Sequence, residues 1–320
     1  MRKVATMPMK PDYLVSADQI HYGWDNTIKP VLTVASGNVV EFETVDASGG
    51  QVTASSNLED VANLDFSRVN PVTGPVYVKD AEPGDVLKIS IVSISPSGWG
   101  WTAVIPGFGL LADRFEEPAL HIWEYDPKSL APARYLKGVQ VPLKPFPGTI
   151  GVAPGAEGEH SVVNPRRVGG NMDTRDLGVG SELYLPVEVP GALFSVGDGH
   201  AAQGDGEVCG TAIESPMNVT VKLEVVKNMR LNFPRVSTPG PVTRHLDGDG
   251  YEVTTGIGPD LLESAKSAVS DMVDFISHSR GLAPAEAYML CSVCADLRIS
   301  EIVDAPDWIV SCYFPRVVFS

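Results

Sequence analysis

The sequence predicts a mainly β fold with an α+β part at its C-terminal end. Short runs that alternate apolar and polar residues recur as far as about residue 255, which is the pattern of half-buried strands. The 31 glycines and 26 prolines are spread through the chain, as expected for many turns between short strands. After Gly256 the apolar residues change to helical spacing. We therefore expect a β-rich sandwich or barrel body over residues 1–255, with an α+β portion over residues 256–320 packed on it.

The first strands of the body have a hairpin-like pattern. Residues 31–45, VLTVASGNVVEFETV, alternate on both sides of a Ser-Gly-Asn sequence, which suits a turn between paired strands. Residues 81–94 repeat the alternation after a Pro-Gly-Asp turn. Further short runs of this kind occur at residues 120–123, 148–152, 183–189 and 218–226. Strands do not alternate with long helices, so the sequence argues against a Rossmann-like sheet.

Two helices and two strands are expected in the C-terminal portion. Apolar residues follow helical spacing over residues 261–276, with a Pro-Asp pair before them. Gly281 suits the end of this helix. A second helix is expected over residues 284–296, followed by strands over residues 298–304 and 308–314.

The chain is acidic, with 40 Asp and Glu residues against 24 Lys and Arg residues and a formal net charge of −16. This balance argues against binding to nucleic acid or to an anionic membrane, because both require a basic surface. The first ten residues have the charges of a signal peptide but no apolar stretch behind them. No apolar run is long enough for a membrane span. We therefore expect a cytoplasmic protein.

The four cysteines, all from Cys209 onward, are too few and too late in the chain for a disulfide framework. Cys291 and Cys294 have the spacing of a redox or metal pair, yet they lie in an apolar segment without a second pair. We expect them to be buried and reduced, since free cysteine behaves as a small hydrophobe. The chain also lacks a G-x-S-x-G elbow, a phosphate-binding G-x-x-x-x-G-K-[ST] loop and an H-E-x-x-H helix.

The strongest candidate for a site is the segment of residues 197–214, GDGHAAQGDGEVCGTAIE. Its glycines lie between two strand-like runs and open no helix, so they do not form a dinucleotide-binding loop. In an extended chain Asp198 and His200 point to the same side, because the side-chain period is two. The same reasoning places Asp205 and Glu207 on one side. Carboxylates around an imidazole are suitable ligands for a divalent metal; the alternative is a Gly-rich double turn with solvated acids.

Two further polar, turn-like stretches favour a site over a solvated turn. Residues 165–181 carry Asn171 and Asp173 directly behind a Gly-Gly pair. Residues 21–26, HYGWDN, lie near the N-terminus. Three such stretches far apart in the sequence are typical of a composite site, in which loops converge on a rigid β scaffold.

Several blocks of the chain resemble the acetamidase/formamidase family, and together they span about residues 20–310. They are HYGWDNTIKPVLTVASG, NPVTGPVYVKDAEPGDVL, GWGWTAVIPGFGLLADRFEEPAL, PFPGTIGVAPG, GGNMDTRDLGVGSELYLPVEVPGALFSVGDGHAAQGDGEVCGTAIE and ADLRISEIVD. The resemblance implies a jelly-roll-like sandwich with smaller β-rich and α/β portions. It also implies hydrolysis of the carbon–nitrogen bond of a small amide, either linear, such as formamide or acetamide, or cyclic, such as a γ-lactam. Homo-oligomers, dimers or higher, and a bound divalent metal are further expectations from this resemblance.

The resemblance also carries site residues onto this chain. The positions that match the motifs of the family are Asp25, Asn26, Asn171, Asp173, Asp198, His200, Gln203, Asp205, Glu207 and Glu214. Among them we expect Asp173, Asp198 and His200 to hold the metal. Zinc is the first expectation, and calcium or another divalent ion is the alternative.

Glu207 is the candidate proton shuttle for amide hydrolysis, with Asp25 and Glu214 as further catalytic candidates. A second mechanism uses Cys209 as the nucleophile, with Glu207 or Glu214 as its base. No Lys or His within a few residues of Cys209 lowers the pKa of its thiol. The alternative without catalysis is a β-sandwich module that binds a ligand such as a sugar or a peptide.

Aromatic residues in glycine-rich stretches are candidates for the walls of a substrate pocket. They are Trp24, Trp99, Trp101 and Phe108, and the alternative for each is ordinary packing. We expect Trp24 and Trp101, together with Asn171 and Gln203, to contact the substrate. Aromatic walls would suit a hydrophobic or bicyclic amide better than formamide.

Overall fold

The structure is a computed structural model that describes residues 10–319. The expectation about a signal peptide was drawn from the first ten residues. Residues 1–9 lie outside the described part of the chain. Within residues 10–319, no helix combines the length and the apolar character that crossing a membrane requires.

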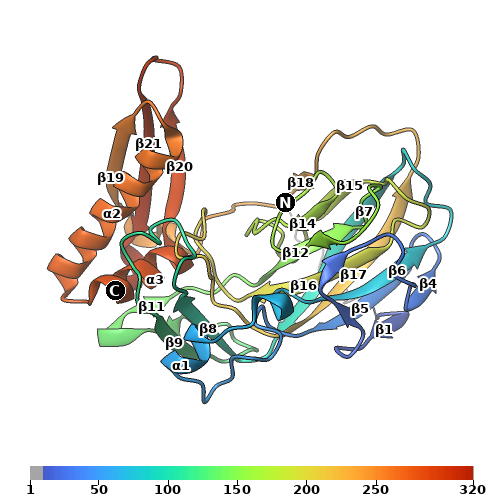
Figure 1. The fold of residues 1–320 in the computed structure, drawn as a ribbon, viewed down its shortest axis with the longest axis horizontal. Coiled ribbons are helices and arrows are strands. Elements are labelled where there is room, and N and C mark those ends of the chain that lie inside the picture. Colours follow the sequence, from blue (N-terminus) through green and yellow to red (C-terminus); the bar gives the residue numbers. More distant parts are fainter. Residues whose placement is uncertain (1–9, 320) are drawn as a thin grey trace.

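Two six-stranded sheets pack face to face and form the sandwich expected for the body (Figure 1). The strand order in the first sheet is β1 (Tyr13–Val15), β5 (Val39–Thr44), β17 (Met217–Val226), β7 (Val86–Pro96), β15 (Glu182–Pro186) and β18 (Arg235–Ser237). The order in the second sheet is β14 (Gly169–Asn171), β12 (Phe146–Val152), β16 (Phe194–His200), β6 (Val72–Val78) and β2 (Ile20–His21), with β4 (Leu32–Val34) also paired to β6. Between the sheets, the rings of Phe42 and Phe194 meet edge to face with centroids 5.5 Å apart. The prediction of a mainly β fold is confirmed.

The predicted hairpin over residues 31–45 is wrong, although both of its strands exist. β4 pairs with β6, whereas β5 pairs with β1 and β17. The N–H of Gly37, in the turn between them, donates to the carbonyl of Leu223 on β17. Alternation of apolar residues determines which face of a strand is buried but not which strand is its partner. The two runs could therefore enter different sheets.

A hairpin and a short helix form a smaller unit beside the sandwich (Figure 1). The hairpin consists of β8 (Trp99–Val104) and β9 (Ala119–Glu124), and α1 (Leu58–Ala62) packs against β9. Apolar side chains of this unit surround Trp101 in a cluster separate from the sandwich core. The remaining short elements are β3 (Gly23–Trp24), β13 (His160–Ser161), β10 (Ala133–Arg134), β11 (Gln140–Val141), η1 (Phe66–Arg68), η2 (Leu136–Gly138), η3 (Asp247–Asp249) and η4 (Arg316–Phe319).

The C-terminal part is a three-stranded antiparallel sheet with two helices (Figure 1). The strand order is β19 (Tyr251–Gly258), β21 (Trp308–Pro315) and β20 (Asp296–Glu301), and the helices are α2 (Leu261–Arg280) and α3 (Pro284–Cys294). The Asp260 carboxylate accepts hydrogen bonds from the N–H groups of Leu262 and Glu263 and so begins α2. Gly281, with a φ of 64°, ends it. The helices and strands expected here are confirmed, with ends shifted by a few residues.

The C-terminal part shares an apolar core with the body. Val104 and Trp123 of the β8–β9 hairpin belong to the same cluster as Met272 of α2 and Tyr288 of α3. The four cysteines are buried in this core and are free, which confirms the expectation of buried, reduced thiols. The division of the chain at residue 255 stays a prediction.

A buried ion pair joins the C-terminal sheet to the body. The two terminal nitrogens of Arg175 bond to the two carboxylate oxygens of Asp296, with 2.8 Å between Nη2 and Oδ2. Neither side chain exposes more than 3% of its surface. Nη2 also lies 3.3 Å from Oδ2 of the half-exposed Asp205, whose N–H donates to Oδ1 of Asp296. Removing one partner of such a pair leaves an unpaired buried charge, which is strongly unfavourable.

We expect Asp296→Asn to lower the free energy of unfolding by about 3 kcal/mol, because the Arg175 guanidinium would stay buried without its main counter-charge. Urea unfolding followed by circular dichroism measures this loss. Asp274→Asn is the matched control, since Asp274 of α2 is exposed and pairs with Arg114 at the surface. An exposed pair contributes at most about 1 kcal/mol, so equal losses in the two variants would contradict the role assigned to the buried pair.

Candidate active site

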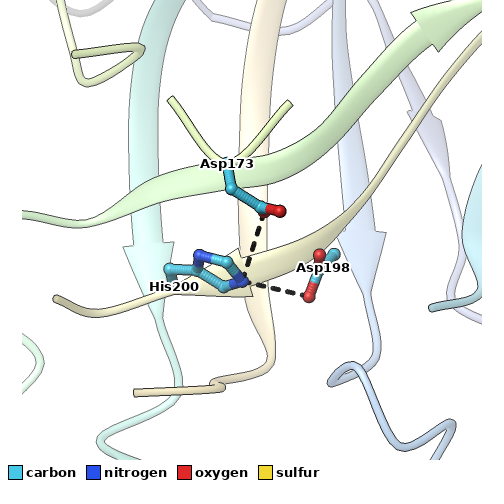
Figure 2. Close-up of side chains that lie close together, drawn as sticks. All are labelled: Asp173, Asp198 and His200. Carbon is cyan, nitrogen blue, oxygen red and sulfur yellow. Dashed lines mark hydrogen bonds and ion pairs between the residues drawn. The ribbon is translucent and has the colours of Figure 1, made fainter. Parts of the chain in front are cut away.

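Four carboxylates surround one imidazole nitrogen at the end of β16. Nε2 of His200 lies 3.2 Å from Oδ1 of Asp198 and 3.2 Å from Oε2 of Glu214. It also lies 3.8 Å from Oε1 of Glu207 and 4.0 Å from Oδ1 of Asp173. Figure 2 shows Asp173 and Asp198 directed toward this nitrogen from different sides. The three residues predicted as metal ligands and two of the three predicted catalytic carboxylates are therefore brought together.

Strand pairing sets the positions of Asp198 and His200. Both belong to β16 and are two residues apart, and their side chains meet on one side of the strand, as predicted, although the backbone of Asp198 is left-handed. The Oγ1 hydroxyl of Thr149, on the neighbouring strand β12, lies 3.1 Å from Oδ2 of Asp198. The ring of Phe146, paired with His200 across the two strands, packs edge to face against the imidazole with centroids 5.1 Å apart. The sheet therefore holds one carboxylate and the imidazole in fixed positions.

Three of the carboxylates stand on strained backbone. The φ angle is 44° at Asp173, 54° at Asp198 and 44° at Glu207. This left-handed region is one that residues other than glycine seldom adopt, and each instance costs of order 1 kcal/mol. Such strain persists where the surrounding structure fixes the backbone, and it is concentrated at functional sites.

A glutamine fixes the orientation of the imidazole. Nδ1 of His200 lies 2.8 Å from Oε1 of Gln203, whose Nε2 donates to the carbonyl of Asp173 at 2.8 Å. Because an amide oxygen can only accept, Nδ1 carries a proton, and in the neutral imidazole Nε2 presents its lone pair to the carboxylates. The structure thus places Gln203, a predicted substrate contact, behind the imidazole rather than in the substrate space.

Burial perturbs the ionisation of every member of the cluster. It raises the pKa of Asp173 to about 6, that of Glu214 to about 7, and that of Glu207 well above its ordinary value. Burial alone would lower the pKa of His200, but the carboxylates of Glu214 and Asp198 outweigh it and raise that pKa well above its ordinary value. For Asp198, burial is outweighed by the charge on His200 and by hydrogen bonds, so its pKa is lowered. Without a further positive charge, the cluster therefore favours protonation of some of its carboxyl groups.

Three observations indicate that the cluster fits a divalent cation. Oδ1 of Asp173 and Oε2 of Glu214 are buried without a hydrogen-bond partner among the described residues, although buried polar atoms are nearly always paired. A Cβ atom on Gly148 would lie 2.7 Å from Oδ1 of Asp173 and 2.7 Å from Cε1 of His200, so only glycine leaves this space open. Donor atoms of Asp173, Asp198 and His200 lie within 4.8 Å of one another. A nitrogen with carboxylate oxygens is a donor set that suits zinc.

A small cavity of about 60 Å³ adjoins the cluster. Its polar and charged lining residues are Ser48, Asn70, Asn171, Asp198, Glu207, Thr211 and Glu214. Its apolar lining residues are Ala47, Leu64, Phe66, Val69, Trp101, Ile105, Phe108 and Val163, and Gly210 completes the lining. An apolar wall combined with polar groups that converge on the same space is typical of a site for a small molecule.

Trp101 and Asn171, two of the predicted substrate contacts, line this cavity. Nε1 of Trp101 donates to Oδ2 of Asp46 at 2.9 Å, so the polar edge of the indole is already satisfied. Nδ2 of Asn171 donates to the carbonyl of Val163 at 3.3 Å. Both side chains are therefore held by the protein while they remain in contact with the cavity.

The structure does not bring Asp25 or Trp24 to the cavity. Oδ1 of Asp25 accepts hydrogen bonds from the N–H and Oγ1 of Thr27 and closes a local turn. Trp24 is buried on β3 in a separate apolar cluster with Val72 and Val162. Among the described residues, neither belongs to the lining of the cavity.

The segment after β16 turns, which separates residues that the sequence placed on one side. Asp205 faces Arg175, whereas Glu207 faces His200. The prediction that Asp205 and Glu207 share a side is wrong, because the chain leaves the extended conformation after His200. Cys209 is fully buried in the core shared with the C-terminal part.

Sequence reasoning did not single out Asn70, Gly148 or Thr149. Asn70 lines the cavity, and its Nδ2 donates to Oδ2 of Asp198 at 3.3 Å. All three residues lie within the blocks NPVTGPV and PFPGTIG, which resemble the family, so a signal was present. One sequence cannot show which small or amide residue of such a block faces a site.

The chain matches the model described as the acetamidase/formamidase family over residues 9–162 and 155–320. It is 28% identical to a putative formamidase of Schizosaccharomyces pombe, over 94% of this chain and 90% of that protein. It is 26% identical to a formamidase of Methylophilus methylotrophus, over 94% and 89%. Its structure is similar to a γ-lactamase from Delftia acidovorans, with a TM-score of 0.88 and 25% identity over 96% of this chain and 93% of that one. An acetamidase from Bacillus halodurans has a TM-score of 0.67 and 33% identity, over 96% and 98%.

If a divalent cation lies in this cluster, we expect Gly148→Ala to weaken the binding of zinc, used as the probe cation, by about tenfold or more, because the new Cβ would push Asp173 and His200 apart. Gly178→Ala is the matched control, since a Cβ there would meet only the carbonyl of Pro145, at 3.6 Å. Equilibrium dialysis against zinc measures the difference, and urea unfolding verifies that both variants fold. If Gly148→Ala bound zinc as tightly as the control, the cation would not lie between these side chains.

Proposed function

Because the chain belongs to the acetamidase/formamidase family, we propose that it hydrolyses the carbon–nitrogen bond of a small amide. The products are a carboxylate and ammonia, or an amino acid where the amide is part of a ring. The observation that carries the proposal is the cluster around His200, three of whose carboxylates line a cavity sized for a small molecule. Amide hydrolysis needs an activated water, stabilisation of the developing oxyanion and a proton for the leaving nitrogen.

We propose that Asp173, Asp198 and His200 hold a divalent metal, with zinc as the ion that this donor set suits best. Calcium or another divalent ion is the alternative, because most of the donors are oxygens. A zinc ion there would polarise the amide carbonyl and lower the pKa of a water molecule. The chain's own contribution is orientation: β16 sets Asp198 and His200, and Gln203 keeps a proton on Nδ1 so that Nε2 stays available.

Glu207 is the residue that we propose as the proton shuttle. Its carboxylate lines the cavity and lies 3.8 Å from Nε2 of His200. From that place it can accept a proton from the attacking water and deliver it to the leaving nitrogen. Glu214 is held more firmly, because its Oε1 accepts the N–H of Ala212 at 2.7 Å. We propose that Glu214 supports the reaction by keeping negative charge beside His200.

The location of Cys209 weighs against a thiol nucleophile. Its side chain is fully buried and does not belong to the lining of the cavity. Burial also raises the pKa of the thiol, and the Sγ atom lies 3.4 Å from the carbonyl oxygen of Ala103. A nucleophile needs access to the substrate and an activating base, and neither is available to this sulfur.

We propose that the protein assembles as a homo-oligomer. Several apolar side chains of the C-terminal part are exposed, among them Ile257, Leu262, Ile299 and Val303. Of these, Leu262 and Ile299 line one surface groove together with Leu261, Leu297 and Val310. Contiguous apolar surface on a folded chain is typical of a face that another protein covers. A second copy of the chain is the partner that the resemblance to the family implies.

We expect His200→Ala to reduce ammonia release from acetamide by at least about a thousandfold and to lower the zinc content of the purified protein. Both losses follow because the imidazole is the one nitrogen donor of the cluster. A coupled ammonia assay and atomic emission spectroscopy measure them. Cys209→Ser should keep both activity and zinc. Retention of activity in His200→Ala, or its loss in Cys209→Ser together with iodoacetamide sensitivity, would favour the thiol mechanism instead.

We expect Glu207→Gln to lower kcat by about 10²- to 10⁴-fold with zinc content unchanged, because the amide cannot carry the proton. Glu263→Gln on the exposed surface of α2 is the control. Steady-state kinetics with acetamide and metal analysis of the same sample give both readouts. An unchanged kcat would exclude Glu207 as the shuttle, and a parallel loss of zinc would identify it as a ligand.

A further inference from the structure

We propose that Phe66 and Phe108 form an apolar wall of the cavity that binds an apolar acyl group of the substrate. This wall would determine which amides the protein prefers. This inference rests on the proposed function, because it concerns the amide that the cavity receives. Hydrolysis that releases ammonia acts on a primary amide, whose only carbon substituent is on the acyl side. An apolar contact made by the cavity is therefore a contact with the acyl group.

The two rings meet beside the cavity. Phe66 belongs to η1 and Phe108 to the loop after β8, and both line the cavity. Their centroids are 6.1 Å apart and their planes cross at 66°. Phe66 exposes 50% of its surface. An aromatic ring that lies half in water beside a cavity gains free energy when an apolar group of a ligand covers it.

Phe108 is tied to the loop that carries the proposed proton shuttle. A Cβ atom on Gly210 would lie 2.5 Å from Cδ1 of Phe108, so the ring packs directly on the backbone of residue 210. Gly210 in turn donates its N–H to the carbonyl of Glu207 at 2.8 Å. The apolar wall and the carboxylate are thus held at a fixed separation, and an acyl chain on the wall places its amide group beside Glu207.

Leu64, Ile105 and Trp101 are further apolar lining residues, beside polar ones such as Ser48, Asn70 and Thr211. Leu64 and Ile105 are aliphatic. Trp101 donates its indole N–H to the buried Asp46, so its ring presents only an apolar surface. Formamide has no acyl carbon chain and would leave this wall uncovered, whereas a short aliphatic amide would cover it.

The volume of the cavity limits the length of the acyl chain. A water molecule needs about 10–15 Å³ of such space, so about 60 Å³ holds roughly four to six non-hydrogen atoms. Acetamide has four such atoms, propionamide five and butyramide six. Hexanamide has eight and exceeds this volume, so we expect its chain to press against the rings of Phe66 and Phe108. Propionamide and butyramide are therefore the amides that fill the cavity best.

Each methylene group that a longer acyl chain buries against the wall should raise kcat/KM about three- to fourfold. For the unaltered protein we therefore expect kcat/KM to rise about tenfold from acetamide to butyramide and to fall at hexanamide. In Phe66→Ala and Phe108→Ala, the ratio of butyramide to acetamide should drop at least about threefold. In these variants kcat/KM for hexanamide should rise relative to that for butyramide, because the smaller alanine side chain leaves more room for the acyl chain.

The experiment measures kcat/KM for formamide, acetamide, propionamide, butyramide and hexanamide in the unaltered protein and the two variants. Phe233→Ala is the matched control, since Phe233 exposes 70% of its surface and lies outside the lining of the cavity. Its substrate ratios should equal those of the unaltered protein. If Phe108→Ala fails to fold, Phe66→Ala carries the test, because that ring is already half in water.

Two results with these five amides overturn the inference while leaving the proposed function intact. One is a preference for formamide in the unaltered protein. The other is a butyramide-to-acetamide ratio that stays the same in the variants that fold. If the unaltered, zinc-loaded protein hydrolyses neither these five amides nor a γ-lactam, the proposed function fails, and the inference about its substrate falls with it. Hydrolysis of the γ-lactam alone overturns the inference and leaves the proposed function intact.

Discussion

Nε2 of His200 lies within 4.0 Å of oxygen atoms from four carboxylates in the protein interior, and the rest of the structure depends on how this negative charge is accommodated. Water does not solvate these oxygens freely, and one imidazolium cannot neutralise them all. A cation relieves both problems at once. The unpartnered oxygens of Asp173 and Glu214 and the space kept open by Gly148 support a cation at the same place.

The scaffold fixes this cluster from two directions. β16 lies between β12 and β6 inside a sheet, so the strand that carries His200 cannot shift without breaking two ladders. The loops that carry the other carboxylates are tied to the C-terminal sheet through Asp296. Arg175, two residues after Asp173, and Asp205, two residues before Glu207, both bond to it. Both loops thus make contacts with the same carboxylate, that of Asp296. These contacts help to hold the left-handed backbone of Asp173 and Glu207 in place.

The sequence could predict those features that depend only on residues close together in the chain. The side-chain period of a strand placed Asp198 beside His200 without any knowledge of the fold. The HYGWDN stretch shows the limit, because a motif does not tell whether Asp25 faces a site or its own backbone, and here the carboxylate bonds to Thr27. Gln203 is a similar case, since its contact with His200 depends on the turn after β16. The partners of β4 and β5 are set by the packing of whole sheets, which no single alternating run encodes.

The residues proposed to cleave the amide bond and those of the apolar wall come from different parts of the chain. The carboxylates and His200 stand on β16 and on loops anchored to the sheets. The wall comes from the β8–β9 unit and the α1–η1 segment, whose apolar side chains pack in a cluster of their own around Trp101. A change of side chain at Phe66 leaves the sandwich core in place, whereas a change at Phe108 removes a contact with the backbone of Gly210, in the loop that carries Glu207. Because Phe66 is half in water and packs outside the sandwich core, its side chain can change while β16 keeps the carboxylate of Asp198 and the imidazole of His200 in place. One fold can therefore serve more than one amide, which agrees with the names formamidase, acetamidase and γ-lactamase among proteins similar to this chain.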